Sequence, residues 1–251
     1  MAAAPPDARP EEVLIETVRR LLPGARHVAA GANSPIPLAA ALLQQRREPA
    51  MIVSLQQSPE LNLFTDGGKE LFDAAGQGRI DVFFFSGAEI DGQGNINLVA
   101  IGDYAHPTVR FAGSYGSAFL YFTVPRIILF RTEHSRRTLV EKVSFVSAPG
   151  TSPPGVWRRG GPIALVTPLC LFAFDKARAR FRLESIHPGH TLEEVRDRTG
   201  FVFDATALVP MTKLPDAGLL AELRGPVARE VAKAYPKFAA DLFGIAARAS
   251  A

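Results

Sequence analysis

Apolar and polar residues alternate along the first 85 residues in blocks that predict helices and strands in turn. Helical spacing of apolar residues, opened by Glu11 and Glu12 and closed by Pro23-Gly24, predicts a helix over 11–22. Similar patterns predict strands over 27–30, 50–55 and 80–85 and helices over 35–45 and 69–77. Strands that alternate with helices usually pair in parallel, so this half predicts a sheet covered by helices.

The second half of the chain changes to consecutive short strands. Apolar runs predict strands over 126–130, 143–146, 163–166, 171–174 and 181–185, followed by helices over 192–198 and 216–223. No repeat and no dividing linker is visible, which predicts a single domain over 1–251. Its Ala/Pro-rich residues 1–10 are expected to be disordered, and 226–251 is expected to be a helical tail kinked at Pro236.

Glycine turns and a polar hairpin gather between Gly78 and Gly116. The strand over 80–85 ends at Ser86-Gly87-Ala88, where a small residue beside glycine lets a backbone approach a ligand closely. Turn residues follow over 91–95, so a further strand is expected over 96–101. The next break is Gly113-Ser114-Tyr115-Gly116. This stretch predicts a ligand-binding edge.

Several ordered motifs extend the pattern downstream. They are GAEIDGQGNIN (87–97), IGDYAHPTVR (101–110), GSYG (113–116), RRTLVEKV (136–143), SAPG (147–150), LESIHPG (183–189) and TGF (199–201). Together they resemble the β-subunits of family I coenzyme A transferases, especially the glutaconate CoA-transferase type, over roughly residues 25–215. The resemblance implies an α/β fold with an open, mostly parallel sheet flanked by helices. It also implies a separate α-subunit, in a heterodimer or an α2β2 assembly, and an acyl-CoA substrate with no bound cofactor.

The resemblance implies a glutamate nucleophile directly after the strand predicted over 50–55. In the family this carboxylate attacks the acyl-CoA thioester, passes through an anhydride, and becomes a glutamyl-CoA thioester that hands CoA to a second acid. Here Gln56 stands at the aligned position, and Ser58 replaces the glycine that follows in the family. An amide cannot form this intermediate. Gln56 therefore favours the family's relatives that hydrolyse, ring-open or decarboxylate acyl-CoAs.

Three sources could supply a catalytic carboxylate. Glu60 would serve if the alignment shifted, although Pro59 and the missing glycine argue against it. Glu89 stands where the family often has glutamine and could act as a general base, or could be a carboxylate satisfied by turn amides. The third source is the α-subunit. True CoA transfer and a non-catalytic scaffold subunit therefore stay open as alternatives.

Other candidate site residues follow from the same resemblance. Gly116 aligns with a glycine whose backbone N–H helps form an oxyanion hole. Tyr115 replaces a family glycine, and its ring would narrow the acyl pocket. Ser34 begins a helix whose N-terminus faces the site in the family. The remaining substrate-binding candidates are Gly87, Ala88, Asn95, Asn97, Gly113 and Ser114. Each glycine, asparagine and serine named here could instead be an ordinary turn or capping residue.

Composition and charge narrow the class of protein. With 251 residues, 47% of them hydrophobic, the chain can bury one sizeable core. A net charge of +3 without a clustered basic tract argues against a nucleic-acid surface. Arg136-Arg137 and Arg158-Arg159 are either anchors for CoA phosphates or solvated surface charges.

Compartment and metal content are read from the same composition. The longest apolar runs fall short of the roughly 20 residues that cross a bilayer. The lone Cys170 and the missing signal-peptide pattern predict the cytoplasm. No metal site is expected, because the histidines lack paired short spacings with cysteine or carboxylates.

Overall fold

The computed structural model describes residues 7–56 and 58–245, which form two compact units. The first unit joins the two ends of the chain, 1–65 with 213–251, and the second spans 66–212. Of the predicted disordered start and helical tail, residues 1–6 and 246–251 lie outside the described residues. The single domain over 1–251 stays a prediction.

The first unit contains a parallel strand pair and most of the helices. Its elements are α1 (Pro10–Arg19), β1 (His27–Ala30), α2 (Pro35–Gln45), β2 (Ile52–Leu55), α6 (Ala217–Glu222), the π-helical turn η1 (Leu223–Val227), α7 (Ala228–Ala234) and α8 (Pro236–Phe243). β1 and β2 pair in parallel from His27↔Ile52 to Ala30↔Leu55. The parallel pairing predicted from alternating strands and helices is confirmed for these strands.

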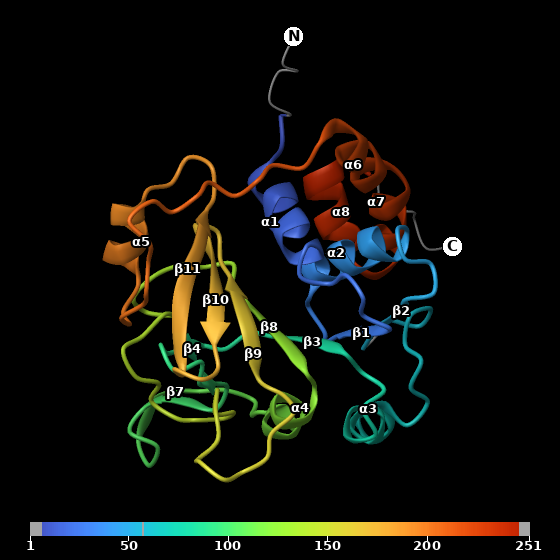
Figure 1. Ribbon diagram of the computed structural model, residues 1–251. Helices are drawn as coiled ribbons and strands as arrows, with labels where there is room; N and C mark the ends of the chain where they lie inside the picture. The colour runs from blue at the N-terminus through green and yellow to red at the C-terminus, as the bar shows by residue number, and fades with distance from the viewer. Residues whose placement is uncertain (1–6, 57, 246–251) are drawn as a thin grey trace. The chain divides into compact units, whose positions relative to one another are not determined.

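Helix α2 is the centre of this unit. Its residues 36–44 are buried without a break, so it is apolar on all sides rather than amphipathic. Prolines at the start of the helix suit its first turn, where a backbone N–H has no helical acceptor. α2 packs against β1, β2, α1, η1 and α7, and Figure 1 shows these helices gathered as one group.

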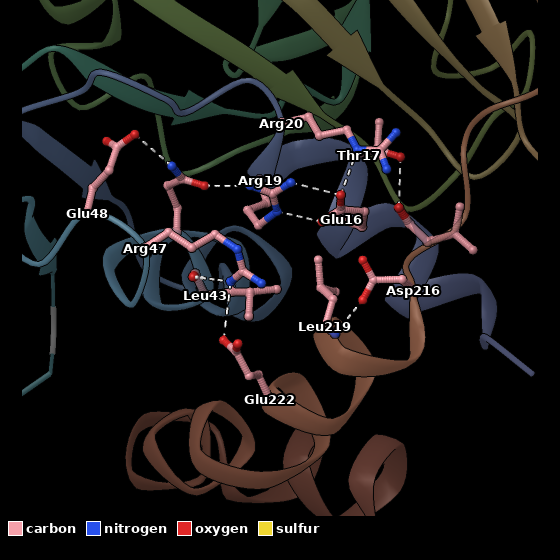
Figure 2. A network of polar contacts seen from close by, with 12 residues as sticks. Glu16, Thr17, Arg19, Arg20, Leu43, Arg47, Glu48, Asp216, Leu219 and Glu222 are labelled. Carbon is pink, nitrogen blue, oxygen red and sulfur yellow. Dashed lines mark hydrogen bonds and ion pairs between the residues drawn. The ribbon is translucent and has the colours of Figure 1, made fainter. Parts of the chain in front are cut away.

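Charged residues join α1, α2 and the C-terminal helices (Figure 2). Arg19 of α1 donates to Glu16 at 2.6 Å and to the side chain of Gln44 on α2 at 2.6 Å. Arg47, just after α2, pairs with Glu222 of α6 at 3.2 Å. Arg19 thus joins α1 to α2, and the Arg47–Glu222 pair joins the end of α2 to α6.

The C-terminal helices depart from the predicted kinked tail. α7 ends at Ala234, and Tyr235 leaves the helical region with φ −132° and ψ 67°. Pro236 then begins α8 as its first residue. The chain therefore breaks into two helices, because the residue before a proline is disfavoured in helical conformation.

The second unit contains a five-stranded sheet, two small hairpins and three helices. Its elements are α3 (Gly67–Gly76), β3 (Val82–Phe85), β4 (Glu89–Ile90), β5 (Ile96–Asn97), β6 (Ala100–Gly102), β7 (Pro107–Arg110), α4 (Ser117–Thr123), β8 (Arg126–Phe130), β9 (Pro162–Val166), β10 (Cys170–Asp175), β11 (Arg180–Ile186) and α5 (Leu192–Arg198). The order is β11-β10-β9-β8-β3. β3, β8 and β9 are parallel, whereas β10 is antiparallel to both neighbours. Figure 1 shows β8 to β11 side by side.

Two strand predictions in this unit are wrong, and side-chain acceptors explain both. Residues 143–146 form no strand, because the N–H of Ser144 donates to Glu89 and that of Val143 donates to Asp91. The strand expected over 96–101 is split between β5 and β6. The side-chain oxygen of Asn97 accepts from Val99 and Ala100 and turns the chain there.

Within residues 7–56 and 58–245, no helix is both long and apolar enough to cross a membrane.

Candidate functional site

Two predicted site residues of the first unit lie at the carboxyl edge of the β1–β2 pair. Gln56 directly follows β2, and its backbone N–H donates to the carbonyl of Ala30, the last residue of β1, at 3.0 Å. Ser34 is the N-cap of α2 and follows Asn33, which has a positive φ of 54°. The half-buried Gln56 therefore lies at the same edge of the strand pair from which the chain continues into α2.

The C-terminal segment reaches the Ser34 turn. The backbone N–H of Ser34 donates to the Tyr235 hydroxyl at 3.0 Å, and its side chain donates to the carbonyl of Ala32 at 3.2 Å. Burial raises the pKa of Tyr235 above its usual value. The predicted anion-binding start of α2 thus already uses one of its N–H groups within the protein.

Residues 58–61 form a tight turn. Ser58 is buried, and its hydroxyl accepts from the N–H of Leu61 at 3.2 Å. The alternative nucleophile Glu60 is exposed in this turn. Ser58 therefore closes the turn at the position where the family has glycine.

In the second unit, Glu89 is buried and fully engaged. The residue is only 5% exposed. Oε2 accepts from the side chain of Asn97 at 2.7 Å and from the N–H of Ser144 at 2.7 Å, while Oε1 accepts from the Ser144 hydroxyl at 3.0 Å. These contacts tie the β4–β5 hairpin to the 143–146 segment.

The two asparagines of the hairpin are also engaged within the protein. Asn97 is fully buried and uses both ends of its amide. Its Nδ2 donates to Glu89 and to the carbonyl of Ala100 at 2.6 Å, and its Oδ1 accepts from the N–H groups of Val99 and Ala100. Asn95 donates to Asp91 at 3.0 Å and accepts from the N–H of Gly150 at 2.9 Å. Both residues hold turns in this structure.

Gly87 and Ala88 meet the same hairpin. A Cβ at Gly87 would lie 2.7 Å from the carbonyl oxygen of Glu89, so no larger residue fits without a shift. The N–H of Ala88 donates to the carbonyl of Asn97 at 2.8 Å. The glycine predicted to admit a ligand therefore admits the protein's own backbone at this point.

The 113–116 turn has an unusual backbone. Gly113, Tyr115 and Gly116 have positive φ of 118°, 40° and 65°, and Ser114 accepts from the N–H of Ser117 at 2.8 Å. Tyr115 is the residue of this turn for which a left-handed conformation is costly, because it has a side chain.

Aromatic rings surround that turn. Tyr115 is 62% exposed and stacks obliquely on Phe72 of α3, with ring centroids 5.7 Å apart. A Cβ at Gly116 would lie 2.5 Å from the Phe72 ring. Gly116 itself is exposed, and its N–H makes no hydrogen bond to another described residue. The turn therefore presents one free backbone donor beside an aromatic face.

The arginines proposed as phosphate anchors have partners of their own. Arg136 donates to the carbonyl of Asp197 at 2.5 Å, and Arg137 pairs with Glu133 at 2.7 Å. Arg158 donates to the carbonyl of Tyr121 at 2.9 Å and is half buried. Arg159 lies beside Gly78. An open hollow of about 650 Å³ beside α5 is lined by Arg136, Thr191, Glu193, Glu194, Arg196 and Asp197, so Arg136 is the one candidate phosphate anchor in its lining.

Two buried histidines lie beyond the ends of β8 and β11. His134 bridges the hydroxyls of Thr167 at 2.8 Å and Thr199 at 2.9 Å. His187 contacts the Thr212 hydroxyl at 2.8 Å. Burial lowers the pKa of each histidine to about 4, so both are neutral at neutral pH.

The structure brings the candidates together in three groups. Ser34 and Gln56 share the β1–β2 edge of the first unit. Gly87, Ala88, Glu89, Asn95 and Asn97 share one hairpin of the second unit, and Gly113 to Gly116 share one turn. Sequence reasoning passed over Arg131, although a charge placed directly after the apolar strand 126–130 was a signal for the carboxyl end of a strand.

Known proteins similar to this chain come from one family and its relatives. The chain is 34% identical to the B subunit of the 3-oxoadipate CoA-transferase of Pseudomonas knackmussii over 161 residues, covering 62% of each protein. It is 33% identical to the B subunit of the glutaconate CoA-transferase of Acidaminococcus fermentans over 150 residues, which is 57% of this chain and 55% of that protein. It is 29% identical to the cholesterol ring-cleaving hydrolase IpdB subunit of Rhodococcus jostii over 151 residues, 59% of each. The chain matches less than two thirds of the length of each relative.

The fold is also found in a solved structure. The decarboxylase AibA/AibB superimposes with a TM-score of 0.76 and 25% identity, covering 95% of this chain and all of that one. This similarity confirms the predicted α/β class. The family model of coenzyme A transferase matches residues 12–198. The chain therefore belongs to the coenzyme A transferase family.

Proposed function

We propose that this chain is the β-subunit of a two-subunit enzyme that hydrolyses an acyl-CoA or cleaves a carbon–carbon bond in its acyl group. The proposal rests chiefly on Gln56, which directly follows β2 where the family's chemistry needs a carboxylate. The carboxyl ends of parallel strands are where open α/β sheets bind ligands. An amide in that place cannot form the glutamyl-CoA intermediate of CoA transfer.

Gln56 can still take part in the reaction. Its amide carries two donors and an acceptor, so it can orient a water molecule or hold a carbonyl oxygen of the substrate. In hydrolysis of the thioester, the water oxygen bonds to the carbonyl carbon, the carbon–sulfur bond breaks, and the CoA sulfur leaves as a thiolate that takes up a proton. In decarboxylation, the bond between the acyl chain and its carboxylate breaks, CO2 leaves, and the carbon that keeps the electron pair takes up a proton. Neither route requires an enzyme-bound acyl group.

Gly116 supplies the proposed oxyanion donor. Its exposed N–H has no hydrogen-bond partner among the described residues, and Phe72 backs it. A preorganised backbone donor is worth about 3 kcal/mol in the transition state of acyl chemistry. Tyr115 and Ser114 of the same turn, with Gly113, would contact the acyl group.

Glu89 is a proposed general base, and a structural role is the alternative. Its three hydrogen bonds favour a carboxylate that holds the hairpin. A general base also needs reach to the proton that it removes. Glu89→Gln separates the roles, since it keeps the shape of the side chain. If Glu89 is a base, the variant should lose turnover and keep its native stability. If Glu89 is a structural carboxylate, the variant should lose stability first.

The partner and compartment complete the proposal. All three relatives are themselves named as subunits of larger enzymes, which supports an α-subunit in a heterodimer or an α2β2 assembly. Ser34, Gly87, Ala88, Asn95 and Asn97 would line or support the acyl-CoA site. Cys170 is free and buried, which suits a reducing compartment such as the cytoplasm. No bound cofactor enters the proposed chemistry.

Two alternatives have their own support. The names of the two CoA-transferase relatives favour true CoA transfer, for which the exposed Glu60 would be the nucleophile. The internal hydrogen bonds of Glu89 and Asn97 favour a scaffold subunit whose partner carries all the chemistry.

Gln56→Glu tests the proposal directly. The variant restores a carboxylate, so the complex with its α-subunit should form a covalent glutamyl-CoA thioester, seen as added CoA mass on this chain. The wild-type complex should turn over acyl-CoA without such an adduct. An adduct on the wild-type chain at Glu60 would favour transfer instead. Unchanged turnover in Gln56→Ala with intact assembly would favour the scaffold.

A further inference from the structure

Arg131 lies at the carboxyl edge of three parallel strands in the second unit. It directly follows β8, and its backbone N–H donates to the carbonyl of Val166, the last residue of β9, at 3.0 Å. On the other side of β8, Leu129 pairs with Phe85 of β3. Arg131 and Gly87 therefore each stand two residues beyond that pair, at the edge where such sheets bind ligands.

The charge of Arg131 is poorly compensated. Its side chain is 22% exposed, and its buried Nε makes no hydrogen bond to another described residue. The carboxylate of Glu133 is 3.7 Å from its Nη2, longer than a hydrogen bond. Glu133 already accepts from Arg137 at 2.7 Å and from the Ser135 hydroxyl at 2.5 Å. Burial lowers the pKa of Arg131, as it does that of Arg158, so the two arginines differ in their hydrogen bonds and not in the direction of this shift.

Arg158 is a half-buried guanidinium whose N–H groups have acceptors within the protein. It donates to the carbonyls of Tyr121 at 2.9 Å and Gly160 at 3.2 Å. Arg131 has no comparable acceptor among the described residues. The charged groups that act on Arg131 are Glu133, which raises its pKa, and Arg137, which lowers it. A partly buried cation with few acceptors costs stability, and a carboxylate or phosphate oxygen would satisfy it.

We infer that Arg131 is an anion-recognition residue that binds a carboxylate or phosphate oxygen of the acyl-CoA. This inference rests on the proposed function. The oxygen belongs either to a carboxylate carried on the acyl group or to a phosphate of CoA. Both offer the planar or clustered oxygens that a guanidinium binds with two parallel N–H donors.

Binding measurements on the assembled complex test the inference without turnover. Calorimetry with free CoA and with glutarate would compare wild type, Arg131→Met, Arg131→Lys and Arg137→Met. Arg137 is the matched control, because it pairs with the same Glu133 from an exposed position. Arg131→Met should weaken one of the two ligands by roughly 10- to 100-fold, Arg131→Lys by less, and Arg137→Met by less than twofold.

The pattern of losses identifies the anion. Weaker glutarate with unchanged CoA assigns Arg131 to an acyl carboxylate, and the reverse assigns it to a CoA phosphate. Arg131→Met should keep or raise the Tm, since it removes a partly buried and poorly compensated charge. Unchanged binding of both ligands would overturn the inference while leaving the proposed function intact, and so would a Tm drop of more than about 5 °C, which would mark Arg131 as structural. A wild-type complex that binds neither ligand would overturn both.

Discussion

The side chain of Asn97 donates to the carboxylate of Glu89 at 2.7 Å, and both residues are buried. This bond links the two strands of the β4–β5 hairpin across the stretch in which the family motif is densest. The hairpin is thus held by polar groups that sequence alone presented as ligand contacts.

Asn97→Asp should unfold this hairpin. The change places a second carboxylate against Glu89 and removes the amide donors, so like charges face each other in a buried site. We expect a loss of about 3 kcal/mol in the free energy of unfolding, measured by urea denaturation at pH 7.5. Asn62→Asp is the control and should lose clearly less, because Asn62 is exposed and its side-chain oxygen only accepts from the N–H of Phe64, a bond that aspartate keeps. Equal losses would show that the Glu89–Asn97 pair has no special weight.

Tyr115→Gly should separate stability from substrate choice. Glycine relieves the positive φ of 40°, which offsets the removal of the Tyr115 ring from Phe72, so the Tm should change by only a few degrees. If Tyr115 narrows the acyl pocket, the variant should accept bulkier acyl-CoAs with a lower KM. An unchanged order of KM values across an acyl-CoA series would remove Tyr115 from the pocket.

Acid should destabilise the protein through His134 and His187. Both have folded-state pKa values of about 4, below the usual 6.5. The unfolded chain therefore binds protons first, and the stability from these neutral histidines is full above pH 6.5 and lost as the pH falls towards 4. Each should contribute a slope of up to about 1.4 kcal/mol per pH unit in that window.

Urea titrations at pH 7.5, 6.5 and 5.5 would measure this slope. Carboxylates contribute little above pH 5.5, so the histidines should dominate there. His134→Asn should flatten the curve, and His106→Asn, at an exposed position, should not. A wild-type stability independent of pH between 7.5 and 5.5 would mean that the histidines are not held neutral by burial.

The ion pair between Arg224 and Glu12 should anchor the C-terminal segment. Glu12 is fully buried, and Arg224 reaches both of its oxygens at 2.6 and 2.7 Å. Arg224→Met leaves that carboxylate without its main partner and should cost about 2 kcal/mol, less than for a wholly buried pair because Arg224 is partly exposed.

A matched pair and a double variant give the controls for this prediction. Glu230→Gln breaks the exposed pair with Lys233 and should cost less than about 0.5 kcal/mol. Combining Glu12→Gln with Arg224→Met should recover part of the loss. A double variant as unstable as the sum of the single variants would show that the two residues act independently.

Much of the fold could be predicted from periodicity. The bounds of β1, α2, β8 and α5 match the predicted ranges, because each combines an unbroken apolar pattern with clear turn or capping signals. The strand predicted over 143–146 was wrong for a physical reason. Its apolar residues suit a strand, but its backbone N–H groups are taken by Glu89 and Asp91, which lie more than fifty positions earlier. No local pattern reports such acceptors.

The candidate site could likewise be predicted only in part. Motif order was enough to identify the family, whose model matches residues 12–198. The fate of each polar side chain was not visible, because Gly87, Asn95 and Asn97 look alike whether they serve a ligand or a hairpin. Arg131 was missed because its importance lies in a missing counter-charge, which only the three-dimensional surroundings reveal.

The most direct test of the proposed chemistry follows the oxygen and the CoA. The chain, assembled with its α-subunit, would be given an acyl-CoA panel with ¹⁸O-labelled water and ¹³C-labelled acetate, and the products analysed by mass spectrometry. We expect ¹⁸O in the released or ring-opened acid, or CO2 without transfer, and no CoA adduct on the protein. Labelled acetyl-CoA together with a protein-bound CoA thioester would show that a nucleophile exists and would contradict the role assigned to Gln56.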